Sequence, residues 1–203
     1  MHIEKNVCDN IIGTLLNIPG KTKDGVNCRK DLVEMGLRKE LAPQVKEKRT
    51  YLPPACYSLT RAEKIMVCKS LLELKVPDGY SSNFRSRVSM EDLKLYGLKS
   101  HDCHVLMQQL LPIAIRGALP KHVGYAIIRA CFFFNAICAK VVDVQKLQEI
   151  QKELVVTLCL LEKYFPPSFF DIMVHLMVHL VREVELGGPV FWRWMYPPER
   201  SAY

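Results

Sequence analysis

The feature that most limits the possible folds is a helical spacing of apolar residues, which is clearest between residues 171 and 185. This stretch reads DIMVHLMVHLVREVE and carries a polar residue at every fourth place, at Asp171, His175, His179 and Glu183. Residues four apart lie on one face of an α-helix, so the stretch predicts a helix that is apolar on most sides and has one polar seam. A membrane span needs roughly 20 mostly apolar residues, whereas ionisable groups recur here at every turn. We therefore expect no membrane-spanning helix.

Helical signals recur along the rest of the chain. Ile3, Val7, Ile11 and Leu15 follow one another at intervals of four, which predicts an amphipathic helix at the start. The residues that can begin later helices are Thr60 with Glu63, Ser89 with Asp92, Ser100, Pro120, Asp143, and Ser168 with Asp171. We expect Pro112 to kink the helix that contains it. Because no alternating strand pattern is present, we predict an all-α fold, with a helical bundle in the C-terminal half and a looser, basic, helical N-terminal part.

The composition and the first residues indicate in which cellular compartment the protein works. The chain has 203 residues, of which 49% are hydrophobic, so it can bury a core. Its eight cysteines form no Cys-x-x-Cys pair, and several lie in apolar helical runs such as RACFFFNAICAK, which favours buried, reduced thiols. The initial MHIEKNVCDN lacks the cationic start and apolar stretch of a signal peptide. We predict a protein of the nucleus or cytoplasm that is not secreted.

The charge is positive and unevenly distributed. The chain has 28 basic and 21 acidic residues, a formal net charge of +7, and most of the surplus lies in residues 1–75. A turn-like segment, VPDGYSSNFRSRVS, adds two arginines and is expected to be a mobile cationic loop. Such an excess permits contact with nucleic acid without requiring it. The candidate nucleic-acid-binding residues are Lys21, Lys23, Arg29, Lys30, Arg85 and Arg87.

Two clusters contain residues that can bind metals. His175 and His179 lie one helical turn apart and could share an ion with a neighbouring carboxylate, but Leu176 occupies the place of the glutamate in a His-Glu-x-x-His protease. We expect Leu176 to lie on a buried face. The sequence His101-Asp102-Cys103-His104 is a tight cluster without the second ligand pair of a structural zinc site. We interpret both clusters as structural polar groups, with His175 and His179 as the alternative metal candidates.

Several long blocks resemble proteins encoded by plant CACTA (En/Spm-type) transposons. The blocks are MHIEKNVCDNIIGTLLNIPGKTKDG, LPPACYSLT, LKVPDGYSSN, GLKSHDCHVLMQQLLPIAIRGALP, FPPSFFDIMVHLMVHLVREVELGGPV and RWMYPPER. Residues 1–50 resemble the C-terminal end of a transposase core, and residues 51–203 resemble the transposase-associated domain of unknown function 4218. The resemblance implies a helical accessory or interaction domain that is truncated at its C-terminal end. It also implies that Met1 corresponds to an internal methionine of longer relatives.

The resemblance has consequences for catalysis. The resemblance implies a transposase core that holds two divalent metals with three carboxylates on an RNase H-like fold, and Glu4 resembles the third of these. The other two have no counterpart here, so Glu4 is expected to be an inactive remnant and the chain not to be an enzyme. No cofactor is expected for this chain, and Mg²⁺ only for a full-length transposase. The implied partners are DNA, bound weakly and without sequence specificity, and a transposase core or a second copy of the chain, with no membrane.

Two other functions remain open on the sequence. One is a nucleic-acid-binding module that uses the basic N-terminal half. The other is a helical metallo-hydrolase built on His175 and His179.

Overall fold

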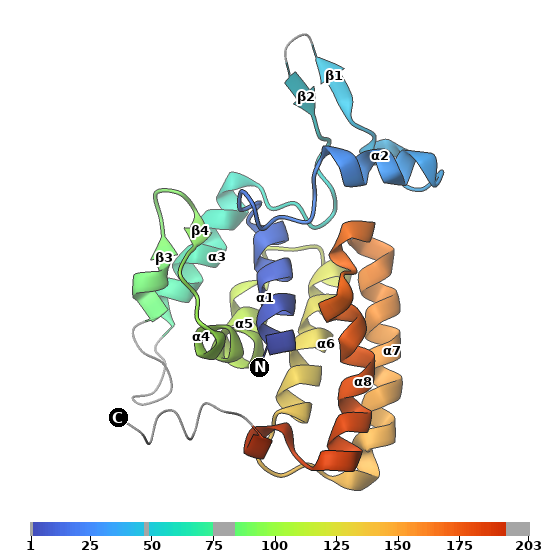
Figure 1. Ribbon diagram of the computed structural model, residues 1–203. Coiled ribbons are helices and arrows are strands. Elements are labelled where there is room, and N and C mark those ends of the chain that lie inside the picture. The colour runs from blue at the N-terminus through green and yellow to red at the C-terminus, as the bar shows by residue number, and fades with distance from the viewer. Residues whose placement is uncertain (1, 47–48, 75–83, 194–203) are drawn as a thin grey trace.

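The computed structural model describes residues 2–46, 49–74 and 84–193, and this part of the chain is mainly helical (Figure 1). The α-helices are α1 (His2–Leu15), α2 (Val26–Glu34), α3 (Arg61–Glu73), α4 (Ser100–Val105), α5 (Leu111–Ala114), α6 (Lys121–Ile137), α7 (Leu147–Tyr164) and α8 (Ile172–Gly187). The two small antiparallel hairpins are β1 (Gln44–Lys46) with β2 (Arg49–Tyr51), and β3 (Val88–Ser89) with β4 (Lys94–Leu95). The predicted all-α class is confirmed.

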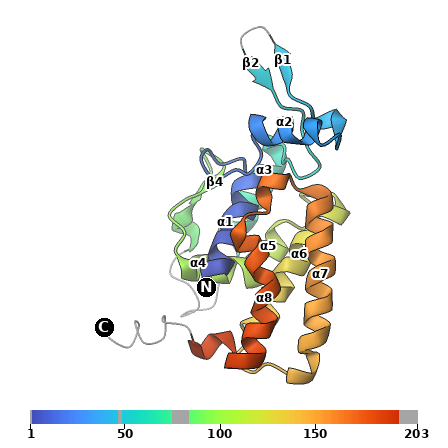
Figure 2. The same cartoon turned by 45° about the vertical axis from the view of Figure 1, so that its right-hand side comes forward.

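The three long C-terminal helices pack side by side. Figures 1 and 2 show α7 beside both α6 and α8, with neighbouring helices running in opposite directions. Their apolar residues recur at helical spacing, so each helix buries one stripe: Phe134, Leu154, Leu161 and Met177 are all 0–1% exposed. None of the helices in the described ranges combines the length and apolar character that a bilayer crossing demands.

Helix α1 lies inside the molecule, against α4 on one side and α8 on the other (Figure 1). Val7, Cys8 and Ile11 are 0% exposed, and they belong to the same hydrophobic core as the C-terminal helices. The looser N-terminal part therefore begins only at α2, beyond which the β1–β2 hairpin projects (Figures 1 and 2). Residues 1–50 and 51–203 share one core, so the division between them is one of sequence resemblance, and its boundary stays a prediction.

Arg38 attaches the projecting segment to the bundle. Its guanidinium donates hydrogen bonds to the backbone oxygens of Glu162, Tyr164 and Phe165, at 2.5, 3.0 and 2.8 Å. The last carbonyls of a helix have no partner within the helix, so Arg38 closes the C-terminal end of α7.

Of the six expected helix starts, only the one at Ser89 is wrong, because a helix begins at or beside the predicted residue in the other five. Thr60 and Glu63 form the capping box of α3, and Asp171 caps α8. Ser89 does accept a hydrogen bond from the amide of Asp92 at 3.1 Å, but the segment that follows is the β3–β4 hairpin instead of a helix. The same serine–aspartate bond occurs in turns and at helix starts, and here Leu93 has a φ of 52°, which ends any helical path.

Pro112 follows an irregular turn of its helix, and the predicted kink stays a prediction. Proline lacks an N–H group and its ring clashes with the carbonyl four residues earlier, here that of Gln108. The turn Leu106–Leu110 between α4 and α5 accordingly widens into a π-helix. Wide turns of this kind occur often at functional sites.

Candidate functional sites

A buried polar cluster joins α1 to α4 and to the π-helical turn. Glu4 of α1 is only 2% exposed. The Nδ1 atom of His104 lies 2.9 Å from Oε2 of Glu4 and 3.1 Å from Oε1. Gln108 donates from Nε2 to Oε1 of Glu4 at 3.1 Å and to the backbone oxygen of Phe134 at 3.3 Å. A carboxylate is costly to bury without such partners, so these bonds make the buried position of Glu4 possible.

A cysteine completes this cluster. Cys138 follows the last residue of α6, and one ligand atom each from Glu4, His104 and Cys138 lie within 4.8 Å of one another. Burial and the nearby carboxylate of Glu4 raise the pKa of the Cys138 thiol well above its ordinary value of 9.0, so the thiol is protonated at neutral pH. A cavity of about 230 Å³, lined in part by His2, Glu4 and Cys138, borders the cluster.

The structure places Glu4, the expected catalytic remnant, in this cluster and not in a set of carboxylates. Within the described ranges, Glu4, His104 and Cys138 are the one group of at least three acidic, histidine or cysteine residues close enough to share an ion. The role of Glu4 as a remnant of a transposase site stays a prediction.

The two histidines named as metal candidates lie on the solvent side of α8. The rings of His175 and His179 are 5.3 Å apart between centroids, and both side chains are exposed. In the described part of the chain they do not join a third ligand residue. The buried face of α8 consists of Val174, Met177, Val181 and Val184. The expectation that Leu176 is buried is wrong in detail, because this side chain lies off that stripe and is only partly buried.

Most of the candidate nucleic-acid-binding residues already have acidic partners. Arg29 is 1% exposed, binds both carboxylate oxygens of Asp24 at 2.5 and 2.6 Å, and donates to the backbone oxygen of Leu41. The other ion pairs are Lys21 with Asp9 at 3.0 Å, Lys23 with Asp171 at 3.0 Å, and Arg87 with Asp102 at 3.7 Å. Lys30 and Arg85 are exposed, on α2 and on the turn before β3. The six residues come from three segments: the loop after α1, helix α2, and the turn before β3. Of the expected mobile loop, residues 76–83 lie outside the described ranges.

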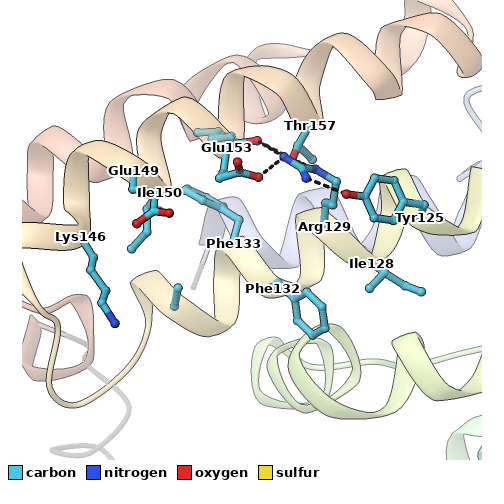
Figure 3. Close-up of a pocket in the computed structure, with 12 residues that line it drawn as sticks. Tyr125, Ile128, Arg129, Phe132, Phe133, Lys146, Glu149, Ile150, Glu153 and Thr157 are labelled. Carbon is cyan, nitrogen blue, oxygen red and sulfur yellow. Dashed lines mark hydrogen bonds and ion pairs between the residues drawn. The ribbon is translucent and has the colours of Figure 1, made fainter. Parts of the chain in front are cut away.

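A second feature is an apolar groove between α6 and α7 (Figure 3), with a volume of about 390 Å³. Its apolar lining consists of Ile128, Phe132, Phe133, Ala136, Ile150 and Leu154. Two aromatic side chains at the groove face solvent, since Tyr125 is 54% and Phe132 is 62% exposed. We refer to this surface as the α6–α7 groove.

The one arginine that lines the groove is fully engaged within the protein. Arg129 donates to Thr157 Oγ1, to the hydroxyl of Tyr125 and to the backbone oxygen of Glu153, each at 3.0 Å, and it forms an ion pair with the Glu153 carboxylate (Figure 3). Because this guanidinium already has its partners, it is not presented to an anionic ligand. The groove therefore offers mainly apolar surface.

The sequence patterns predict neither the polar cluster of Glu4, His104 and Cys138 nor the α6–α7 groove, although the groove has a signal in the sequence. The run FFF at residues 132–134 cannot face the core with all three rings, because consecutive helical residues point about 100° apart. Phe133 and Phe134 are 6% and 1% exposed, and Phe132 is the ring left outside. The polar cluster gave no comparable signal, since Glu4 and His104 are 100 residues apart.

A comparison with protein families gives one match. Residues 137–203, from the end of α6 through α7 and α8, match the family described as Domain of unknown function (DUF4218), a domain associated with plant transposases. The match lies within the range 51–203 in which this domain was expected. No curated protein and no solved structure matches the chain.

Proposed function

We propose that this chain is a helical, non-catalytic accessory domain derived from a plant CACTA-type transposon, and that it binds a second copy of itself through the α6–α7 groove. The family match at residues 137–203 and the sequence blocks that resemble transposon proteins support the first part. The groove with its exposed aromatic rings supports the second.

The groove is suited to a symmetric contact. In a two-fold dimer the same surface patch occurs on both subunits, so it must contain both a projection and a hollow. Phe132 is an exposed ring beside a hollow of about 390 Å³, and the two copies could each place this ring in the groove of the other. Full burial of a phenyl side chain contributes roughly 1.5–3 kcal/mol, and exposed apolar patches commonly mark interaction sites.

The test is the mass of the full chain in solution, measured by sedimentation velocity over a range of concentrations. We expect Phe132→Ser to weaken dimerisation on the order of 100-fold, because the loss of two symmetric phenyl contacts corresponds to about 3 kcal/mol. The matched control is Leu186→Ser, which removes an apolar side chain of 74% exposure from α8, outside the groove, and should leave dimerisation unchanged.

Two outcomes contradict the proposal. One is a wild-type protein that stays monomeric at all concentrations. The other is a dimer that Phe132→Ser does not weaken, which would place the interface elsewhere.

The two alternative functions have less support from the geometry. Four of the six cations assigned to nucleic acid are paired with carboxylates. A metallo-hydrolase on His175 and His179 needs further ligands, and in the described ranges these two residues join no larger group.

A further inference from the structure

We propose that Glu4, His104 and Cys138 form a zinc site that ties α1, α4 and the end of α6 together. Their ligand atoms lie within 4.8 Å of one another, although the residues come from three elements that are far apart in sequence. The site differs in ligands and in metal from a magnesium site made of three carboxylates, and it does not involve His175 or His179.

The donor set suits zinc. Zn²⁺ binds thiolate sulfur, imidazole nitrogen and carboxylate oxygen, whereas Mg²⁺ and Ca²⁺ take oxygen ligands. A thiolate and a carboxylate supply two negative charges, a neutral imidazole supplies none, and Zn²⁺ balances them. Because Glu4 and Cys138 are buried, at 2% and 7% exposure, a complex without net charge avoids the cost of an uncompensated ion in the core.

The surroundings provide the remaining parts of a metal site. A ring nitrogen of His104 and the carboxylate of Glu4 already face each other at 2.9 Å, so both ligand atoms can reach one ion. Gln108 holds Glu4 through a hydrogen bond of 3.1 Å and is itself fixed to the backbone oxygen of Phe134, as an outer-shell residue does. The neighbouring cavity of about 230 Å³, lined in part by His2, has room for a fourth ligand.

Binding follows a simple proton balance. The Cys138 thiol loses its proton to solvent as its S–H bond breaks and a Zn–S bond forms. His104 binds as the neutral imidazole through one ring nitrogen, with its proton on the other ring nitrogen, and no oxidation state changes. Because a thiol must be deprotonated to bind the metal, protons compete with the ion for this ligand. Zinc affinity should therefore increase with pH.

The experiment uses the full chain, stripped of metal by a chelator and carrying no histidine tag. Titration with Co²⁺ as a spectroscopic substitute for zinc should give the charge-transfer band of a thiolate ligand at one ion per chain. Cys138→Ser should abolish this band, and Gln108→Ala should weaken metal binding roughly 10–100-fold because it removes an outer-shell hydrogen bond. Zn²⁺ should displace Co²⁺ and raise the melting temperature of the wild type.

Two control variants separate this site from other ligands. Cys159→Ser removes an exposed cysteine, and the double change His175→Ala with His179→Ala removes the exposed histidine pair. Both should bind the metal as the wild type does. A wild type without the thiolate band, or Cys138→Ser with the wild-type band, overturns the proposal. If circular dichroism shows that Cys138→Ser is unfolded, the test uses the wild type alone. A wild-type melting temperature that neither zinc nor chelator changes also overturns the zinc proposal.

Discussion

At the scale of single residues, Asp171 holds together three segments of the chain. Its Oδ1 accepts the amides of Met173 and Val174 at the start of α8, at 3.0 and 3.2 Å. Its Oδ2 accepts from Asn10 at 2.8 Å and from Lys23 at 3.0 Å. Partial burial acts to raise the pKa of Asp171, but these hydrogen bonds and the charge of Lys23 outweigh it, so the pKa lies below the ordinary 3.8.

This lowered pKa leads to a prediction on stability. A carboxyl group whose pKa is lower in the folded than in the unfolded state stabilises the fold above its unfolded pKa, and this contribution is lost as the pH falls through the folded pKa. The free energy of unfolding of the wild type should thus decline below about pH 4, in a range set by the ordinary value of 3.8. Asp171→Asn should lose about 1–2 kcal/mol at neutral pH and decline less steeply.

Urea denaturation at a series of pH values measures both effects of Asp171→Asn. Asp143→Asn is a suitable control, because Asp143 accepts the amide of Gln145 at 3.0 Å at an exposed position. Equal pH profiles for wild type and Asp171→Asn would contradict the assigned role of Asp171.

At the scale of elements, α8 illustrates how burial decides the effect of a substitution. Met177 is 0% exposed, whereas His175, two residues earlier, faces solvent. We expect Met177→Asp to cost several kcal/mol or to prevent folding, because it buries a charge without a partner. His175→Gln should change the free energy of unfolding by no more than about 0.5 kcal/mol. Chemical denaturation of the two variants checks this pair, and a large loss in His175→Gln would show that the histidine has a buried role.

The elements that the sequence predicts well are those whose signals lie within one helical turn. The bond between Thr60 and Glu63 and the cap at Asp171 are local, so the types of these residues and their spacing are enough to predict both helix starts. The β3–β4 hairpin was missed because Ser89 and Asp92 make the same local bond in a turn as at a helix start. The Glu4–His104 contact depends on how α1 packs against α4, and no pattern within either helix records that packing.

At the scale of the whole molecule, the basic residues fall into two groups. Those paired with carboxylates should affect mainly the stability of the fold, and those exposed to solvent should affect mainly the affinity for DNA. Lys21 and Lys23 are bound to carboxylates, so their replacement by alanine should lower stability and hardly affect DNA. Lys30→Ala and Arg85→Ala remove exposed charges and should lower DNA affinity. We expect the wild type to bind duplex DNA weakly, without sequence preference, and with an affinity that falls steeply as salt increases.

Mobility-shift titrations at low and moderate salt measure this binding for the wild type and the four variants. Denaturation curves of the same proteins provide the stability comparison. No binding by the wild type even at low salt would remove nucleic acid from the partners of this chain.

The central position of α1 also determines when the hydrophobic core can form during synthesis of the chain. Asn10 of α1 is hydrogen bonded to Asp171, which lies 161 residues later in the chain. A ribosome therefore releases the apolar side chains of α1 long before it makes the helix that covers them. Contacts between such distant residues form slowly, and unpaired apolar surface favours aggregation while they are missing. We expect residues 2–15 to stay prone to aggregation until α8 has emerged, so a chain shortened before residue 171 should sediment as aggregates where the full chain does not.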